Sequence, residues 1–418
     1  MKRIALVTLL LVLPLLGMQA AKWKTVVNYD EDKVPSYELP ALLVCNDGTP
    51  VTTARQWTKK RRPEIMEQFR SLMYGRTPTQ KIRVATELVA ENPAALGGKA
   101  TSQQVRFTFS GNGRQVKAML LVYIPNERKG RVPVIWHYNF QGNPSTTDET
   151  DILPSECATS VWGNDKYARG AQKSRWNYLI PIERGYAVAT MCYEDICPDT
   201  PEQRDAGVEA LFDGYTTATQ RPDEWQAIGA WAWGSSRVCD WLCKQRWVDR
   251  KRIAIAGHSR LGKAALWAGA QDERFAVVIS NDSGCGGAAL SRRCFGETIE
   301  IITTSFPHWF CPAYSQYGFN ESAMPFDQHG LLALVAPRHL YVDSASEDQW
   351  ADPRGEFLST LAAGEVWTLF GMKGLPSTEM PPIHTPLIGD IGYHIRAGIH
   401  DVTDYDWTAW VDFCDRVW

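Results

Sequence analysis

The pattern of hydrophobic and polar positions predicts an alternation of buried strands and helices. Several short runs are apolar without interruption, as in strands of a parallel sheet that is covered on both faces. The predicted strands are 105–110, which alternates like an edge strand, and then 118–125, 132–138, 185–192, 252–256, 275–280, 339–342 and 366–370. The predicted helices cover 225–247, 262–271, a stretch from about 353, and 404–418. This order indicates an α/β fold, a three-layer sandwich around a mostly parallel central sheet.

The first hundred residues differ from the rest of the chain. Residues 22–80 are mixed in character and rich in Pro, Lys and Arg. We expect residues 22–100 to form an N-terminal extension that packs on a catalytic domain of residues 101–418, with no clear linker. Residues 141–180 are polar and rich in Gly, Ser and Asn, which predicts a long loop, and long loops in compact domains are often functional.

The N-terminus has the order of a secretion signal. Lys2 and Arg3 precede an almost wholly apolar run at 4–16, and small residues follow at 17–21. This order predicts a signal peptide over residues 1–21, because the apolar run is too short to span a bilayer comfortably. No cysteine follows the run closely, so we expect a secreted or periplasmic protein without a membrane anchor.

Composition excludes some partners and leaves the cysteines open. The net charge of −3 gives no basic excess, so nucleic acid is not expected as a partner. Ten cysteines are present, and an exported chain can oxidise them. Cys239 and Cys243 lack further ligands at zinc-site spacing and are interpreted as buried thiols or disulfide halves. We expect no metal and no cofactor, and the sequence does not determine the oligomeric state.

Ser259 lies where a buried strand turns into a helix of small residues. This is the context of a nucleophile elbow, whose sharp turn holds the serine hydroxyl above the sheet. The N-terminus of the following helix offers backbone N–H groups to a developing oxyanion. The usual pattern is G-x-S-x-G, but here Leu261 takes the place of the second glycine and Gly262 follows it. The alternative, Ser259 as a simple helix N-cap, fits this strand–turn–helix context less well.

A serine hydroxyl needs a general base, and three histidines lie beyond residue 370. We predict that His400 is the base, because it lies in a glycine-containing loop just before the last predicted helix. His384 and His394 are expected to be surface or packing residues. His258 adjoins Ser259, but neighbours on a tight turn point apart, so we interpret it as packing or support.

Two loops compete to supply the acid that orients the base. Asp282 follows the strand after the nucleophile helix, whereas Glu347 and Asp348 follow the next strand. The chain order of serine, acid and histidine holds for both loops. The later loop is the commoner position in this type of fold.

The stretch at 257–263, Gly-His-Ser-Arg-Leu-Gly-Lys, resembles the G-C-S-R-x-G-K motif of the glucuronoyl esterases, carbohydrate esterase family 15. Residues 139–143, 282–284 and 350–353 and the His400 loop are also similar to that family. The late glycine is a trait of the family's motif. The resemblance implies an α/β-hydrolase fold and a serine esterase.

The resemblance also implies roles for individual residues. Asp282 matches a position where the family often carries Glu, and its side chain is one carbon shorter. We therefore expect Asp282 to share the acid's role with Asp348 or Glu347. The remaining implied roles are Ser259 as nucleophile, His400 as base, Arg260 as support for the oxyanion, and Lys263, Glu297 and Trp350 as residues that hold the uronic-acid sugar. Positive charge beside the serine agrees with this, although Arg260 and Lys263 would otherwise be read equally well as ordinary surface charges.

One departure concerns how two loops are joined. In fungal members the cysteine before the serine forms a disulfide with the histidine loop. Here His258 and Asp401 stand at those two positions. The resemblance therefore leaves open what holds the serine and histidine loops together.

The expected function is hydrolysis of the ester between glucuronic acid of 4-O-methyl-glucuronoxylan and lignin alcohols, through a glucuronoyl-serine intermediate. The expected partner is therefore a glucuronoxylan or lignin–carbohydrate ester. One alternative is an acetylxylan esterase or another carboxylesterase on the same fold, because a fold does not determine a substrate. Another is a non-catalytic carbohydrate-binding relative, which would be favoured if Ser259 or His400 were missing.

Overall fold

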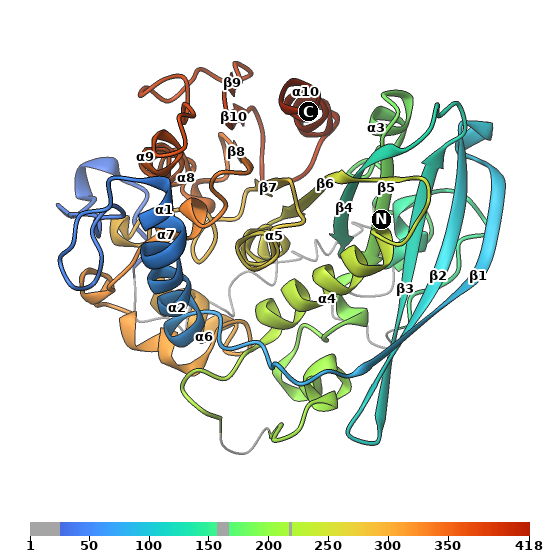
Figure 1. Cartoon of the computed structure of the whole chain (residues 1–418), viewed down its shortest axis with the longest axis horizontal. Helices are drawn as coiled ribbons and strands as arrows, with labels where there is room; N and C mark the ends of the chain where they lie inside the picture. The colour runs from blue at the N-terminus through green and yellow to red at the C-terminus, as the bar shows by residue number, and fades with distance from the viewer. Residues whose placement is uncertain (1–25, 157–166, 217–219) are drawn as a thin grey trace, which may run out of the picture.

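A ten-stranded sheet forms the centre of the molecule in the computed structural model, which describes residues 26–156, 167–216 and 220–418 (Figure 1). The strand order is β1-β2-β3-β5-β4-β6-β7-β8-β10-β9. The strands are β1 (Arg83–Ala95), β2 (Ala100–Gly111), β3 (Arg114–Pro125), β4 (Val132–Asn139), β5 (Ala187–Cys192), β6 (Val248–His258), β7 (Val277–Asn281), β8 (His339–Ala345), β9 (Leu387–Ile388) and β10 (Ile391–Arg396). The predicted signal peptide lies outside the described residues.

The middle of the sheet is parallel. β5, β4, β6, β7, β8 and β10 pair in parallel, while β1, β2 and β3 add antiparallel strands at one edge and β9 adds one at the other. Every residue of β4, β5 and β7 is buried, because both faces of these strands are covered. The prediction of an α/β fold with a mostly parallel sheet is confirmed.

Helices cover both faces of the sheet. α3 and α10 pack on each other on one side, and α4 and α5 pack on each other on the opposite side (Figure 1). The helices are α1 (Ala54–Gln56), α2 (Arg62–Leu72), α3 (Leu179–Glu183), α4 (Ala227–Leu242), α5 (Arg260–Gln271), α6 (Ile299–Ser305), α7 (Gln328–Ala333), α8 (Pro353–Ala363), α9 (Glu365–Thr368) and α10 (Asp404–Val417).

The prediction of a last strand at 366–370 is wrong. This segment forms α9 and the turn after it, because a short apolar run has the same pattern in a buried helix as in a strand. The last long strand is β10, which carries His394 and Arg396 among its buried residues. Asp406 accepts hydrogen bonds from both side chains, so these buried polar groups are satisfied, and they interrupt the apolar run that marks the inner strands.

The antiparallel edge also differs from expectation. Residues 105–110 lie in β2, which pairs on both sides, and the edge strand is β1. Most of β1 is exposed, so it lacks the apolar run that marks the inner strands. The sheet thus begins at residue 83, within the predicted extension, and the division between residues 22–100 and 101–418 stays a prediction.

Two further findings concern membrane-spanning helices and the cysteines. Among the described residues, every helix is too short or too polar to cross a lipid bilayer. No two of the nine cysteines in the described ranges are joined by a disulfide. Cys239 and Cys243 both lie at the end of α4, as buried and half-buried thiols.

Candidate active site

The predicted catalytic side chains converge at the carboxyl ends of four neighbouring parallel strands. Ser259 directly follows β6, Asp282 directly follows β7, and Asp348 and His400 come shortly after β8 and β10. These strands are adjacent in the order β6-β7-β8-β10. Carboxyl ends of parallel strands meet at one edge of a sheet, which is where α/β proteins place their ligand sites.

The turn at Ser259 has the backbone of a nucleophile elbow. Ser259 has φ 57° and ψ −128°, a conformation that non-glycine residues rarely adopt and that costs on the order of 1–3 kcal/mol. A Cβ on Gly257 would lie 2.0 Å from the carbonyl oxygen of Leu261. A Cβ on Gly262 would lie 2.9 Å from the Cβ of Ser283. The displaced second glycine therefore lets the β7 loop approach the nucleophile helix.

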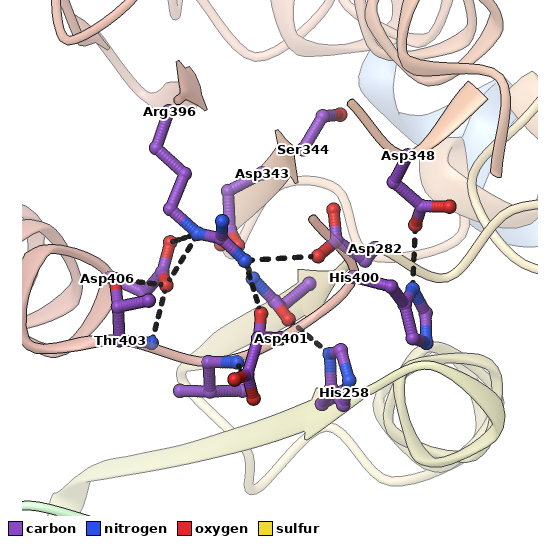
Figure 2. A network of polar contacts seen from close by, with 12 residues as sticks. His258, Asp282, Asp343, Ser344, Asp348, Arg396, His400, Asp401, Thr403 and Asp406 are labelled. Atoms are coloured by element: carbon purple, nitrogen blue, oxygen red, sulfur yellow. Dashed lines mark hydrogen bonds and ion pairs between the residues drawn. The ribbon is translucent and has the colours of Figure 1, made fainter. Parts of the chain in front are cut away.

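His400 is oriented by Asp348 (Figure 2). Its Nδ1 donates to Oδ2 of Asp348 at 2.5 Å, and the side chain of Asp348 is only 5% exposed. This bond leaves Nε2 of His400 as the basic nitrogen. Ser259 and His400 line the same cavity, but no hydrogen bond joins them in the described part of the chain, and such bonds are often long in enzymes without substrate.

Asp282 lies near this pair without bonding to it. A carboxylate oxygen of Asp282 lies within 4.8 Å of the ligand atoms of Asp348 and His400. Its Oδ2 accepts from Arg396 at 3.4 Å, and its Oδ1 is buried without a hydrogen-bond partner among the described residues. Burial raises the pKa of Asp282 well above its usual value, and the negative charges of Asp348 and Glu356 add to the shift.

Glu347, the third candidate acid, points elsewhere. Its side chain is exposed, and its backbone N–H donates to the carbonyl of Gly398. Of the three carboxylates considered from the sequence, Asp348 is the one within hydrogen-bond reach of His400.

Arg396 is the cation at the centre of the carboxylate network in Figure 2. Its guanidinium donates to Asp406 at 2.8 Å as well as to Asp282, and it also reaches the carbonyl of Asp401. Two groups bring possible metal ligands within 4.8 Å of one another, namely Asp282 with Asp348 and His400, and Asp343 with His394 and Asp406. Arg396 pairs with a carboxylate in each group, so both groups already have a positive charge beside them.

His258 packs against His400, so the residue before Ser259 contacts the histidine loop. The ring centroids of the two histidines are 4.4 Å apart, and Nδ1 of His258 hydrogen-bonds to Asn281. Burial lowers the pKa of His258 well below its usual value, and the charge of His400 lowers it further, which favours the neutral ring. Arg175, in the 141–180 segment, forms an ion pair of 2.5 Å with Asp401 of the histidine loop. The contact between His258 and His400 thus joins the serine and histidine loops noncovalently.

A cavity of about 360 Å³ opens on Ser259 and contains the residues expected to hold a sugar acid. Lys263 is buried there and donates to the backbone carbonyl of Ser283. The backbone N–H of Glu297 donates to the backbone carbonyl of Trp350 at 3.0 Å. Burial raises the pKa of Glu297 to about 7, against the lowering effect of Lys263 and Arg260. The lining residues are Ser259, Arg260, Lys263, Asp282, Ser283, Gly284, Glu297, Phe306, Trp309, Asp348, Trp350, Ala351 and His400.

Comparison with known proteins identifies the family. A family profile described as "Glucuronyl esterase, fungi" matches residues 176–371. A carbohydrate esterase from an unknown prokaryotic organism is 44% identical over 403 residues, which cover 93% of this chain and 91% of that protein. The structure of a glucuronoyl esterase from Solibacter usitatus matches with a TM-score of 0.88 at 44% identity, over 93% of this chain and 100% of that one. The structure of a family 15 glucuronoyl esterase from Teredinibacter turnerae matches with a TM-score of 0.80 at 27% identity, over 95% of this chain and 94% of that one.

This chain belongs to the glucuronoyl esterases of carbohydrate esterase family 15. It is therefore a carboxylic ester hydrolase, and its sheet and layers are those of the α/β-hydrolase fold. The resemblance noted from the sequence is confirmed at the level of the family.

Glu356 is a residue of this glucuronoyl esterase site that sequence reasoning missed. Its carboxylate, on α8, accepts from the backbone N–H groups of Ser283 at 2.8 Å and Gly284 at 2.9 Å, and from the hydroxyl of Ser344 at 2.6 Å. Burial raises its pKa to about 8. Glu356 thus holds the loop that follows Asp282, and no local signal reveals this because its partners lie far away in sequence.

Proposed function

We propose that this glucuronoyl esterase hydrolyses esters of glucuronic acid on xylan to lignin alcohols. The observation that carries the proposal is the cavity beside Ser259, which combines buried Lys263 and half-buried Arg260 with Glu297 and the indole of Trp350. Cations suit the oxygens of a uronic acid, and an aromatic face suits a sugar ring. An acetyl group would use little of this cavity.

In the proposed mechanism Ser259 attacks the uronate carbonyl while Nε2 of His400 takes its proton. Asp348 stabilises the imidazolium that forms. The negative charge on the carbonyl oxygen is stabilised by Arg260 and by the backbone N–H groups at the start of α5. His400 then protonates the leaving alcohol, and water releases glucuronate from the glucuronoyl-serine by the same steps in reverse.

We further propose that the protein is exported, on the basis of the signal-like residues 1–21. Its substrate, a polymer of the plant cell wall, lies outside the cell that makes the enzyme.

The test compares benzyl glucuronate, 4-nitrophenyl acetate and acetylated xylan as substrates. We expect the highest kcat/KM for the glucuronate ester, and no activity on any of them for Ser259→Ala, which should keep the melting temperature of the wild type. Equal or better turnover of acetylated xylan would favour the acetylxylan esterase alternative.

A second pair of variants tests recognition of the acid half. Lys263→Gln should lower kcat/KM for benzyl glucuronate by about 10-fold or more, since charge-assisted hydrogen bonds contribute roughly 1.5–3 kcal/mol. It should change the hydrolysis of 4-nitrophenyl acetate much less. Lys251→Gln, an exposed position at the start of β6, is the control and should match the wild type on both esters.

A further inference from the structure

Asp199 is a buried carboxylate that lines neither the cavity of about 360 Å³ at Ser259 nor a second cavity of about 250 Å³, which Ser259 shares with His258 and His400. Its side chain is only 2% exposed, and it lies in the loop after β5, a strand of the parallel part of the sheet. It accepts hydrogen bonds from four side chains. Oδ2 accepts from Tyr193 at 2.7 Å and from Arg260, and Oδ1 accepts from His308 at 2.9 Å and Trp309 at 2.7 Å.

Two of the four partners of Asp199, Arg260 and Trp309, line the cavity beside the nucleophile. Arg260 directly follows Ser259 and lines both cavities. Its guanidinium carbon lies 4.6 Å from the ring centroid of Trp309, and that ring stacks on Phe306 at 3.8 Å. The guanidinium is thus fixed on one side by a carboxylate and on another by an aromatic face.

The charge on Asp199 is stable. Burial alone would raise its pKa, but the charge of Arg260 and the hydrogen bonds from His308 and Trp309 together lower the pKa below its usual value. Without Asp199 the positive charge of Arg260 would lack a partner in this shielded site, and its guanidinium could turn away from Ser259. A group that stabilises a transition state must instead be oriented before the reaction begins.

We infer that Asp199 is a positioning residue that orients Arg260 toward the oxyanion and Trp309 toward the cavity of about 360 Å³ that opens on Ser259. This inference rests on the proposed role of Arg260. Asp199 touches no substrate, so it acts on the reaction through Arg260, and its loss should lower kcat more than it raises KM.

The test is a double-mutant cycle on kcat with Asp199→Asn, Arg260→Gln and the double variant. An asparagine amide keeps one acceptor oxygen, presents N–H donors at its other end and lacks the negative charge, so it cannot accept from both pairs of donors and weakens the anchor of the guanidinium. We expect Asp199→Asn to lower kcat about 10- to 100-fold, within the effect of losing one oxyanion donor. The double variant should be no slower than Arg260→Gln alone, because Asp199 has nothing left to orient. The inference would be overturned if the two single effects on kcat multiplied in the double variant, or if Asp199→Asn left kcat unchanged.

Asp327→Asn is the matched control. Asp327 is equally buried and pairs with Arg292 at 3.3 Å, and neither residue lines a cavity that opens on Ser259. Its loss should lower the melting temperature while leaving kcat within about 2-fold of the wild type, as expected for a change that acts on stability alone.

Tyr193→Phe keeps the test informative if Asp199→Asn does not fold. It removes one hydroxyl donor from the oxygen that also receives Arg260. It should lower kcat in the wild-type background and have no effect in Arg260→Gln, and equal effects in both backgrounds would contradict the inference. Each variant is assayed on benzyl glucuronate and on 4-nitrophenyl acetate. A wild type active only on the acetate would refute the glucuronate substrate while still allowing the coupling to be measured.

Discussion

At the scale of single residues, the structure shows which of two candidate carboxylates, Asp282 and Asp348, hydrogen-bonds to His400, whereas from the sequence we expected both to share the acid's role. Asp348 bonds to His400, whereas Asp282 is held by Arg396 at 3.4 Å. Burial raises the pKa of Asp282, and its nearest cation is Arg396 rather than His400, so it is poorly placed to stabilise an imidazolium. The geometry therefore argues against the shared role expected from the sequence.

Asp348→Asn should lower kcat by up to about 10⁴-fold, the loss seen when a triad acid acts alone. Asp282→Asn should lower kcat by less than about 10-fold, because it removes no bond to His400. Steady-state kinetics on one ester decide between them. Equal losses in the two single variants would restore the shared role.

At the scale of elements, the β6–α5 turn depends on glycines that keep three backbone segments close. The path from β6 through Ser259 into α5 brings Gly257 against the backbone of Leu261 and Gly262 against the β7 loop. Neither contact leaves room for a side chain, so the elbow is a packed junction of elements as well as a local turn.

Gly257→Ala should destabilise the protein by about 3 kcal/mol, because a Cβ 2.0 Å from a carbonyl oxygen forces the backbone to move. Gly330→Ala in α7 is the control. Its Cβ would meet Ile65 and Phe69 at an ordinary 3.5 Å, and alanine favours the helix by about 0.5 kcal/mol. Thermal unfolding of both variants gives the comparison, and equal melting temperatures would show that the junction is not tightly packed.

At the scale of the whole molecule, buried ionisable groups set how stability depends on pH. Burial raises the pKa of Glu194 and Glu356 to about 8 and that of Glu297 to about 7. Burial lowers the pKa of His137 to about 4 and that of His258 well below its usual value. The carboxyls hold extra protons in the folded state, and the histidines hold fewer.

The free energy of unfolding should fall as pH rises from about 6.5 to 8. In this window the unfolded histidines pass from about half protonated to neutral, so their opposing contribution fades as the pH rises toward 8. The folded state still binds more protons than the unfolded one at its raised carboxyls, so raising the pH favours unfolding. Below about 6.5 the histidines act in the opposite direction, because they must bind protons only when unfolded.

Denaturant titrations at pH 6.5 and 8 measure this slope, and the Glu194→Gln/Glu356→Gln variant should flatten it. Glu379→Gln, at an exposed position, is the control and should keep the wild-type slope. A slope unchanged by the double variant would mean that these carboxyls do not carry the effect.

Removal of metal ions should leave activity unchanged. Every step of the proposed reaction is assigned to a serine, a histidine, an aspartate or an arginine. Hydrolysis of benzyl glucuronate is measured with and without EDTA, and a loss that zinc restores would refute the assignment.

The sequence by itself determined the parts of this protein that depend on neighbours along the chain. Continuous apolar runs predicted β4, β5 and β7, and the change from strand to small-residue helix predicted the turn at Ser259. The order of elements predicted the parallel sheet. The choice of His400 came from its place near the end of the chain, and the resemblance to family 15 suggested which residues are expected to hold the sugar.

The tertiary structure alone decided how distant residues pair. Whether Asp282 or Asp348 reaches His400 depends on side-chain lengths and on how β7, β8 and β10 align, and a linear pattern carries neither. The support from Glu356 joins segments 73 residues apart, and that from Asp199 joins segments 61 residues apart. Local patterns reflect periodicity and turns, which are short-range. Buried hydrogen bonds depend on which chain segments the folded sheet places side by side.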